Sequence, residues 1–328
     1  MLLKNMTVQC QNHLFETSTF FKYSVKRCKN CSLTLTFKKK NNLINKLLKI
    51  SKLSNLILNN KILNSLFREL IIDNKPNTDF YKWYHETLNK YQKTKNIKND
   101  KFRELELDEW LKFFNKYNFN FQNKKILFIS EEPGFLPKKI SEIADVKMTA
   151  FDNSVTKKIN DVLKIECRTF DINKDNLSNI FNEKFDVCVS LGNKNYCLDN
   201  ENYLKNLIQI INDDGFLIVD NKSPSLGYLL YWQFHDYIST TFISDDDFEN
   251  ITKKLKLSVK IKEVNRLNIF KYYLFDYHFN TLASKIRFII KFIIYLPFRF
   301  YYFFKNYYFL SDKLGTSNTI YIFRKLKN

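Results

Sequence analysis

Two pairs of potential metal ligands lie near the N-terminus. Cys10 and His13 are separated by two residues, and Cys28 and Cys31, which follow after fourteen intervening residues, repeat that spacing. Two intervening residues let both side chains of a pair reach one ion, and thiolate and imidazole are ligands that zinc favours. The pattern predicts a structural zinc site, because four protein ligands leave no open position for chemistry. The alternative is four unrelated residues near a chain end.

Short apolar runs alternate with amphipathic segments from Lys124 onward. The runs predict five buried strands, at 124–130, 146–152, 165–171, 185–191 and 215–220. Helical patterns follow Gly134 and occupy 155–164 and 202–212. Strands separated by helices indicate βαβ units and a parallel sheet, and such sheets bind ligands beyond the carboxyl ends of their strands. We therefore predict an α/β fold with a Rossmann-like, doubly wound, mostly parallel sheet.

The chain divides into three expected regions. They are a zinc-binding unit at 1–40, a helical connector at 41–120 and the α/β domain at 121–328. Apolar residues at spacings of three and four favour a helix over 41–73, and an aromatic face favours further helices over 79–118. Pro76 separates the two helical stretches, because proline cannot continue a helix.

A last pair of strands is predicted at 258–264 and 318–325, with an aromatic insertion at about 266–316 between them. The longest uncharged run of this insertion, Phe292–Phe298, has seven residues. A spanning helix needs about 20, so this segment is not expected to cross a membrane. We expect residues 285–310 to form a helix that covers the core or a contact between two copies of the chain. The alternative is an amphipathic helix that lies on a membrane surface.

The composition is that of a globular protein. The 328 residues are 45% hydrophobic and 27% charged, which excludes a disordered chain. Six cysteines exclude a disulfide scaffold, and no signal-peptide run begins the sequence, so we expect a cytoplasmic, reducing setting. The 53 basic and 34 acidic residues give a net charge of +19, which favours anionic partners. A/T-rich codons are the favoured source of this charge, since the basic residues form no long block.

The strand-end segments resemble those of a class I S-adenosylmethionine-dependent methyltransferase. In chain order they are KKILFISEEPGFLPKKI, AFDNS, TFDIN, FDVCVSLGNKNYCLD and DDGFLIVD. The segments CQNH and RCKNCSL resemble the zinc-binding unit that precedes this domain in a subset that includes sugar C-methyltransferases. The resemblance covers 10–37 and 124–220, and the later part is similar in plan. It implies S-adenosylmethionine as cofactor and a sugar or related small molecule as acceptor.

The first loop of this family normally reads acidic-x-Gly-x-Gly-x-Gly, because glycines let the backbone approach the cofactor closely. Here Phe128 stands at the acidic position, and Ser130, Glu132 and Gly134 stand at the glycine positions. The loop is therefore degenerate. Either Glu131 or Glu132 supplies the missing carboxylate, or Glu132 occupies the methionine subsite and excludes the cofactor. The third alternative is a loop with surface glutamates that have no role.

The resemblance also assigns roles to residues at the other strand ends. It implies that Asp152 binds the ribose hydroxyls, that Phe151 and Asn153 flank the adenine, and that Asp171 contacts the adenine amino group. Leu191, after the fourth strand, also fits the cofactor-binding pattern. For both aspartates the alternative is helix capping, which is a common task of this residue type.

Two residues are candidates for a general base. Many relatives carry a Glu-His pair where this chain has Asn195 and Tyr196. Tyr196 is a weak base at neutral pH, because the ordinary pKa of tyrosine is about 10. His235, in YWQFHDY on the acceptor side, is better matched to neutral pH, although a structural histidine is the alternative. Methyl transfer is an in-line displacement, so a base is needed only where the nucleophile must lose a proton.

Three functions follow from these residues. The first is methyl transfer to a small-molecule acceptor, such as a nucleotide sugar in surface polysaccharide synthesis. The second is a methyltransferase-like protein that has lost catalysis and serves as a binding or scaffold subunit. The third, nucleic-acid binding through the zinc unit and the positive charge, is the least favoured. A peripheral membrane contact through 285–310 is compatible with each of them, and the oligomeric state stays open.

Overall fold

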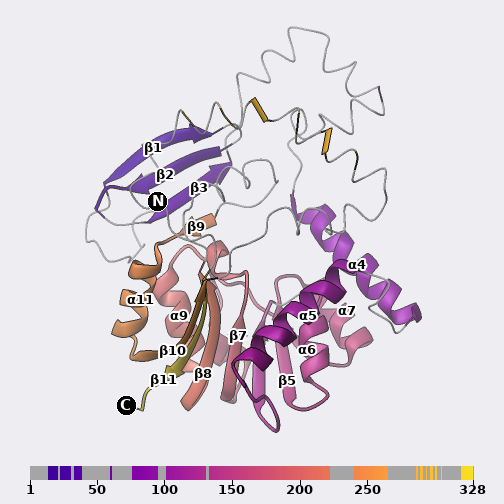
Figure 1. Cartoon of the computed structure of the whole chain (residues 1–328). Coiled ribbons are helices and arrows are strands. Elements are labelled where there is room, and N and C mark those ends of the chain that lie inside the picture. The colour runs from indigo at the N-terminus through magenta and orange to yellow at the C-terminus, as the bar shows by residue number, and fades with distance from the viewer. Residues whose placement is uncertain are drawn as a thin grey trace.

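The computed structural model describes most of the α/β domain and parts of the preceding regions. The described residues are 14–20, 23–30, 33–38, 60, 76–94, 101–130, 133–221, 240–264 and 319–327, with eight residues between 286 and 304. Figure 1 shows one large sheet with helices on both faces and a smaller sheet at one end.

Seven strands form the large sheet in the order β10-β11-β8-β7-β4-β5-β6. They are β4 (Lys125–Ile129), β5 (Asp145–Ala150), β6 (Glu166–Thr169), β7 (Phe185–Ser190), β8 (Ile211–Asn221), β10 (Leu257–Val264) and β11 (Thr319–Lys325). Neighbours from β6 to β8 are parallel, whereas β11 is antiparallel to both β8 and β10. This order confirms the predicted doubly wound, mostly parallel α/β fold.

The side chains of β4 alternate between two apolar cores. Ile126 and Phe128 belong to one core, and Leu127 and Ile129 belong to the other. Successive strand residues point to opposite faces, so a strand covered on both sides needs a continuous apolar run. All four side chains are fully buried. Phe128 therefore fills the core at the position where the family carries its acidic residue.

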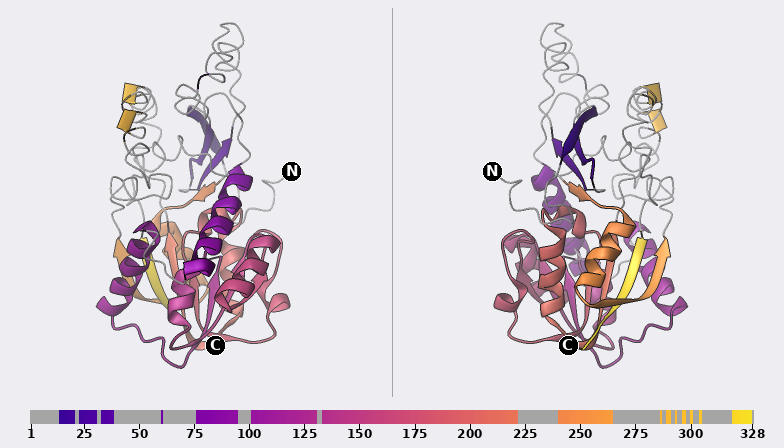
Figure 2. Two further views of the ribbon diagram at one scale, coloured as in Figure 1. Left: turned by 90° about the vertical axis from the view of Figure 1, so that its right-hand side faces the viewer. Right: turned by 90° about the vertical axis from the view of Figure 1, so that its left-hand side faces the viewer.

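Helices cover both faces of the large sheet, as the turned views of Figure 2 show. One face carries α4 (Pro76–Thr94), α5 (Lys101–Lys116), α6 (Phe135–Ile140) and α7 (Asn153–Leu163), and the other carries α8 (Leu177–Ile180), α9 (Asn200–Gln209) and α11 (Asp245–Lys254). The predicted helix over 202–212 is wrong at its C-terminal end. Ile211 already begins β8.

The smaller sheet joins distant parts of the chain. Its strands are β1 (Phe15–Phe20), β2 (Tyr23–Cys28), β3 (Thr34–Lys38) and β9 (Thr240–Phe242), in that order and all antiparallel. Cys28, Leu33 and Leu35 share one apolar core with the large sheet. The Thr241 hydroxyl donates to the Cys197 carbonyl at 2.5 Å, so this sheet lies over the loop that follows β7. The sequence did not predict β9.

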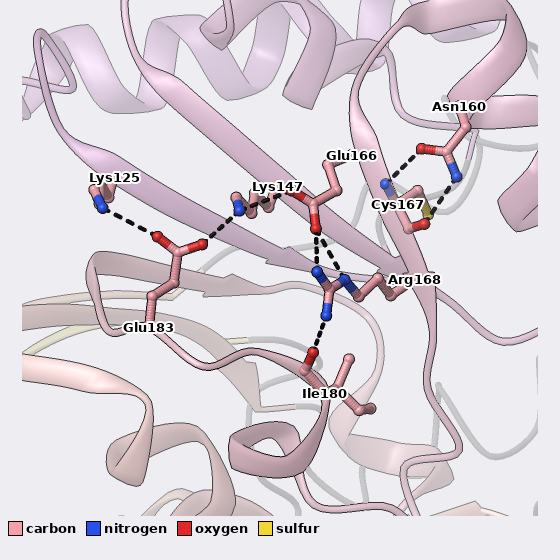
Figure 3. Close-up of polar contacts among 8 residues, drawn as sticks. All are labelled: Lys125, Lys147, Asn160, Glu166, Cys167, Arg168, Ile180 and Glu183. Carbon is pink, nitrogen blue, oxygen red and sulfur yellow. Dashed lines mark hydrogen bonds and ion pairs between the residues drawn. The ribbon is translucent and has the colours of Figure 1, made fainter.

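An ion-pair network joins the strands away from their carboxyl ends (Figure 3). The Nζ atom of Lys147 in β5 lies 2.7 Å from a Glu166 carboxylate oxygen in β6 and 2.5 Å from Glu183. Glu183 also pairs with Lys125, the first residue of β4. Hydrogen bonds to the two glutamates raise the pKa of Lys147, and the same bonds lower the pKa of each carboxyl. The network thus fixes the register of neighbouring strands.

The helices of the described ranges include none that is both long and apolar enough to cross a membrane.

Candidate functional site at the carboxyl edge

The predicted cofactor residues lie at the carboxyl edge of the large sheet. Ser130 follows β4, Asp152 follows β5, Asp171 follows β6 and Leu191 follows β7. The chain first runs outward from β4 to β6 and then returns to β7 on the other side of β4. Sheets of this kind bind ligands in the crevice at such a reversal. Four strand ends that were singled out in the sequence therefore meet at one edge.

Ser130 keeps the backbone conformation that a glycine would adopt. Its φ is 48°, in the left-handed region that favours glycine. Its N–H donates to the Thr149 carbonyl at 3.0 Å and to the Thr149 hydroxyl at 3.1 Å. The Ser130 hydroxyl oxygen is buried, without a hydrogen-bond partner in the described part of the chain. Glu131 and Glu132 lie outside the described residues, so their roles stay predictions.

Gly134 has a packing reason to be glycine. It precedes α6 with a φ of 89°. A Cβ atom at this position would lie 2.9 Å from Cδ1 of Leu163 in α7 and 3.3 Å from the sulfur of Met148 in β5. The missing side chain lets α6 begin directly against α7 and the sheet.

Asp152 caps α7, which confirms the capping alternative. Its Oδ1 atom accepts from the Ser154 N–H at 2.8 Å, from the Val155 N–H at 3.3 Å and from the Ser154 hydroxyl. Burial raises the pKa of the Asp152 carboxyl, but these hydrogen bonds and the nearby His85 outweigh it, so the pKa lies below its ordinary value. The described part of the chain offers no hydrogen bond to Oδ2. Oδ2 thus has no partner among the described residues, and the ribose role of Asp152 stays a prediction.

His85 reaches the same place from α4. Its Nε2 atom lies 2.9 Å from the Ser154 hydroxyl oxygen, although the two residues are 69 positions apart. The sequence analysis gave this histidine no role. No local pattern could have found it, because only the packing of α4 on α7 brings it to the end of β5.

Asp171 stabilises its own turn and does not cap a helix. Its carboxylate accepts from the Lys174 ammonium at 2.7 Å and from the Asn173 N–H at 3.0 Å. Burial raises the pKa of this carboxyl, but the two hydrogen bonds and the Lys174 charge outweigh burial and keep it below its ordinary value. Asn176 caps the following helix, so the capping alternative for Asp171 is wrong.

Tyr196 lies beside residues from two other strand ends. Its ring centroid is 6.4 Å from that of Phe151, and its carbonyl accepts from the Asn173 side chain at 3.1 Å. The exposed Asn153 accepts a hydrogen bond from the Thr169 hydroxyl at 2.5 Å. Phe151 and Asn153, which were predicted to flank an adenine, thus lie beside residues that follow β6 and β7. Whether Tyr196 acts as a base stays a prediction, and so does the role of His235, which lies outside the described residues.

Two polar residues at the carboxyl edge were not predicted from the sequence. Asn193 is buried and donates to the Ile129 carbonyl at 2.6 Å and to the Leu191 carbonyl at 2.9 Å, which joins the ends of β4 and β7. Asp220, at the end of β8, accepts from the Gly192 N–H at 2.7 Å. The only sequence signal for Asp220 was its position as an acidic residue at the end of an apolar run. Asn193 had no signal in the sequence.

Of the four predicted zinc ligands, only Cys28 lies within the described residues; Cys10, His13 and Cys31 lie outside them. Cys28 is buried at the end of β2, where its N–H donates to the Leu33 carbonyl at 2.9 Å and closes the turn into β3. The described residues contain no group of three metal-ligating side chains. The zinc site therefore stays a prediction.

The chain is similar in structure to several methyltransferases. One is the N-methyltransferase NodS from Bradyrhizobium japonicum WM9, in complex with S-adenosyl-L-homocysteine. Its sequence is 10% identical to this chain, and the two structures match with a TM-score of 0.43. The match covers 75% of this chain and 98% of the NodS chain. A TehB-like SAM-dependent methyltransferase from Corynebacterium glutamicum has 15% identity and a TM-score of 0.41 over 74% and 98%. An S-adenosylmethionine-dependent methyltransferase from Mesorhizobium loti has 11% identity and a TM-score of 0.42 over 62% and 92%.

No protein-family model and no curated protein sequence matches this chain. A functional conclusion must therefore come from the strand order and from the residues at the carboxyl edge.

Proposed function

We propose that this chain binds S-adenosylmethionine at the carboxyl edge and transfers its methyl group to a small-molecule acceptor. The observation that carries the proposal is the Asp152 carboxylate, which leaves one oxygen open at the end of β5. It lies one strand away from the strand-order reversal between β4 and β7, on the edge where α/β sheets bind nucleotides. The buried hydroxyl of Ser130, at the end of β4, adds a polar group without a partner in the described structure.

The residues of this edge fit an adenosyl group. A carboxylate oxygen accepts hydrogen bonds from ribose hydroxyls, and the Phe151 and Tyr196 rings offer apolar faces to an adenine. Asp171 and Leu191 would also contact the adenine, and the exposed Asn153 would flank it on the solvent side. When bound, the cofactor supplies a methyl group on a sulfonium centre. The side chains then position the two partners and exclude water between them.

The proposal also names an acceptor class and a structural zinc ion. The resemblance to sugar C-methyltransferases supports a nucleotide sugar as acceptor, and the net charge of +19 suits an anionic substrate. Tyr196 or His235 would accept a proton from an acceptor that has to lose one. A zinc ion held by Cys10, His13, Cys28 and Cys31 would stabilise the small sheet.

Binding of S-adenosylmethionine to Asp152→Asn tests the proposal. Asparagine caps a helix as well as aspartate does but lacks the charge that strengthens a hydrogen bond. We expect affinity to fall by about tenfold to a hundredfold, since a hydrogen bond to a charged group contributes about 1.5–3 kcal/mol. Asp199→Asn is the matched control, because Asp199 caps α9 in the same way. It should bind like the unmodified protein.

Equal affinity in both variants would contradict the role of Asp152. Absence of binding by the unmodified, folded protein at millimolar cofactor would contradict the proposal as a whole. The noncatalytic binding or scaffold role would then become the leading account. Where binding is observed, methyl transfer to a panel of nucleotide sugars tests the acceptor class separately.

A further inference from the structure

Exposed apolar side chains gather in one segment of the chain. The described structure has ten large hydrophobic residues that are exposed, and six of them lie between 286 and 304. We name these six the exposed apolar stripe: Ile286, Ile289, Ile290, Ile293, Phe300 and Phe304, which are 42–69% exposed. The other four are scattered singly over the sequence, which is normal for a folded protein.

The stripe has the spacing of one side of a helix. All six residues have helical backbone. At the helical turn of about 100° per residue, their positions fall within an arc of about 100°. The rings of Phe300 and Phe304, one turn apart, stack with centroids 6.5 Å apart. Six exposed apolar residues on a face of this width, spread over nineteen positions of the sequence, need an apolar partner.

The charge around the stripe identifies that partner. Between Asp276 and Asp312 the sequence contains no acidic residue. It contains five basic residues in that interval, Lys285, Arg287, Lys291, Arg299 and Lys305. A second copy of the chain would bring the same positive charges together, which disfavours association. Anionic headgroups above an acyl layer match both the charges and the apolar face.

We propose that the exposed apolar stripe docks this protein on an anionic lipid bilayer, parallel to the membrane plane. Figure 2 shows the described pieces of this segment, in gold, at the end of the molecule that carries β1, β2 and β3. The small sheet lies over the loop that follows β7, at the carboxyl edge. The inference concerns binding alone and does not depend on methyl transfer.

Co-sedimentation of the full chain with lipid vesicles, without cofactor, tests this proposal. We expect binding to phosphatidylcholine vesicles that contain about 30% phosphatidylglycerol, and weaker binding as salt rises. The double variant Ile289→Glu/Ile293→Glu should lower the partition coefficient by about tenfold or more. The control Ile143→Glu/Val259→Glu makes the same change at two exposed residues elsewhere and should bind like the unmodified protein.

Three results would overturn the proposal. The first is no binding to anionic vesicles at low salt. The second is an equal loss in the stripe variant and the control, with both variants folded by circular dichroism. The third is a dimer in sedimentation velocity that the stripe variant alone converts to monomer, because the stripe would then be a contact between two copies.

Discussion

Replacing Gly134 by alanine is expected to destabilise the α/β domain through two effects of one methyl group. The φ of 89° lies in the left-handed region, where a residue with a Cβ atom costs about 1–2 kcal/mol. The new Cβ would also lie 2.9 Å from Cδ1 of Leu163. That atom ends a flexible side chain, so the overpacking adds only about 1 kcal/mol. The free energy of unfolding should therefore fall by about 2–3 kcal/mol.

Urea denaturation of the two proteins measures this difference, because a change in midpoint at constant slope reports stability. A double-mutant cycle with Leu163→Val separates the two effects. Valine lacks the clashing carbon, so in the alanine background Leu163→Val should cost about 1 kcal/mol less than in the unmodified protein. A loss below about 0.5 kcal/mol in Gly134→Ala, or no coupling with residue 163, would refute the packing of α6 against α7 described above.

Three further predictions concern the same fold. Ser130→Gly should raise the free energy of unfolding by about 1 kcal/mol, because it relieves a left-handed serine and removes a buried hydroxyl; a loss in urea denaturation would contradict this. Lys147→Met should cost about 1 kcal/mol at neutral pH. The pKa values of Glu166 and Glu183 are lowered in the folded state, so their stabilisation is present above the ordinary value of 4.5 and is lost as pH falls below it. The variant and the unmodified protein should therefore converge in stability as the pH falls below 4.5, and a constant difference across pH would contradict the network. Leu33→Ala should lower the free energy of unfolding by about 2–4 kcal/mol in a single calorimetric transition, because Leu33 is fully buried in the core shared by both sheets; a separate early transition would contradict this.

The large sheet could be predicted because its central strands carry their own signal. A strand buried on both faces needs a continuous apolar run, and KILFI and GFLIVD stand out between amphipathic helices. The C-terminal end of α9 was harder to predict, since Ile210 and Ile211 fit a helix and a strand equally well. β9 could not be predicted, because Thr240–Phe242 is too short to show a period and its partner β3 lies some two hundred residues earlier.

Part of the candidate site could be predicted from the sequence, because its residues follow the apolar strands. Asp152 and Asp171 directly follow apolar strands, so the parallel fold alone brings them to one edge. The sequence could not tell which of the two caps a helix: Asp152 caps α7 through one carboxylate oxygen, and Asp171 caps none. His85 and Asn193 depend on packing between segments far apart in sequence, which local patterns do not encode.

Hydrogen–deuterium exchange with and without S-adenosyl-L-homocysteine tests the central claim most directly, because it reports both binding and its location. The account predicts slower exchange in the segments that follow β4, β5, β6 and β7, and unchanged exchange at the opposite edge. That opposite edge holds a shallow hollow lined by Gln122, Ser141 and Glu142. No protection at saturating ligand, or protection confined to this hollow, would contradict a cofactor site at the carboxyl edge.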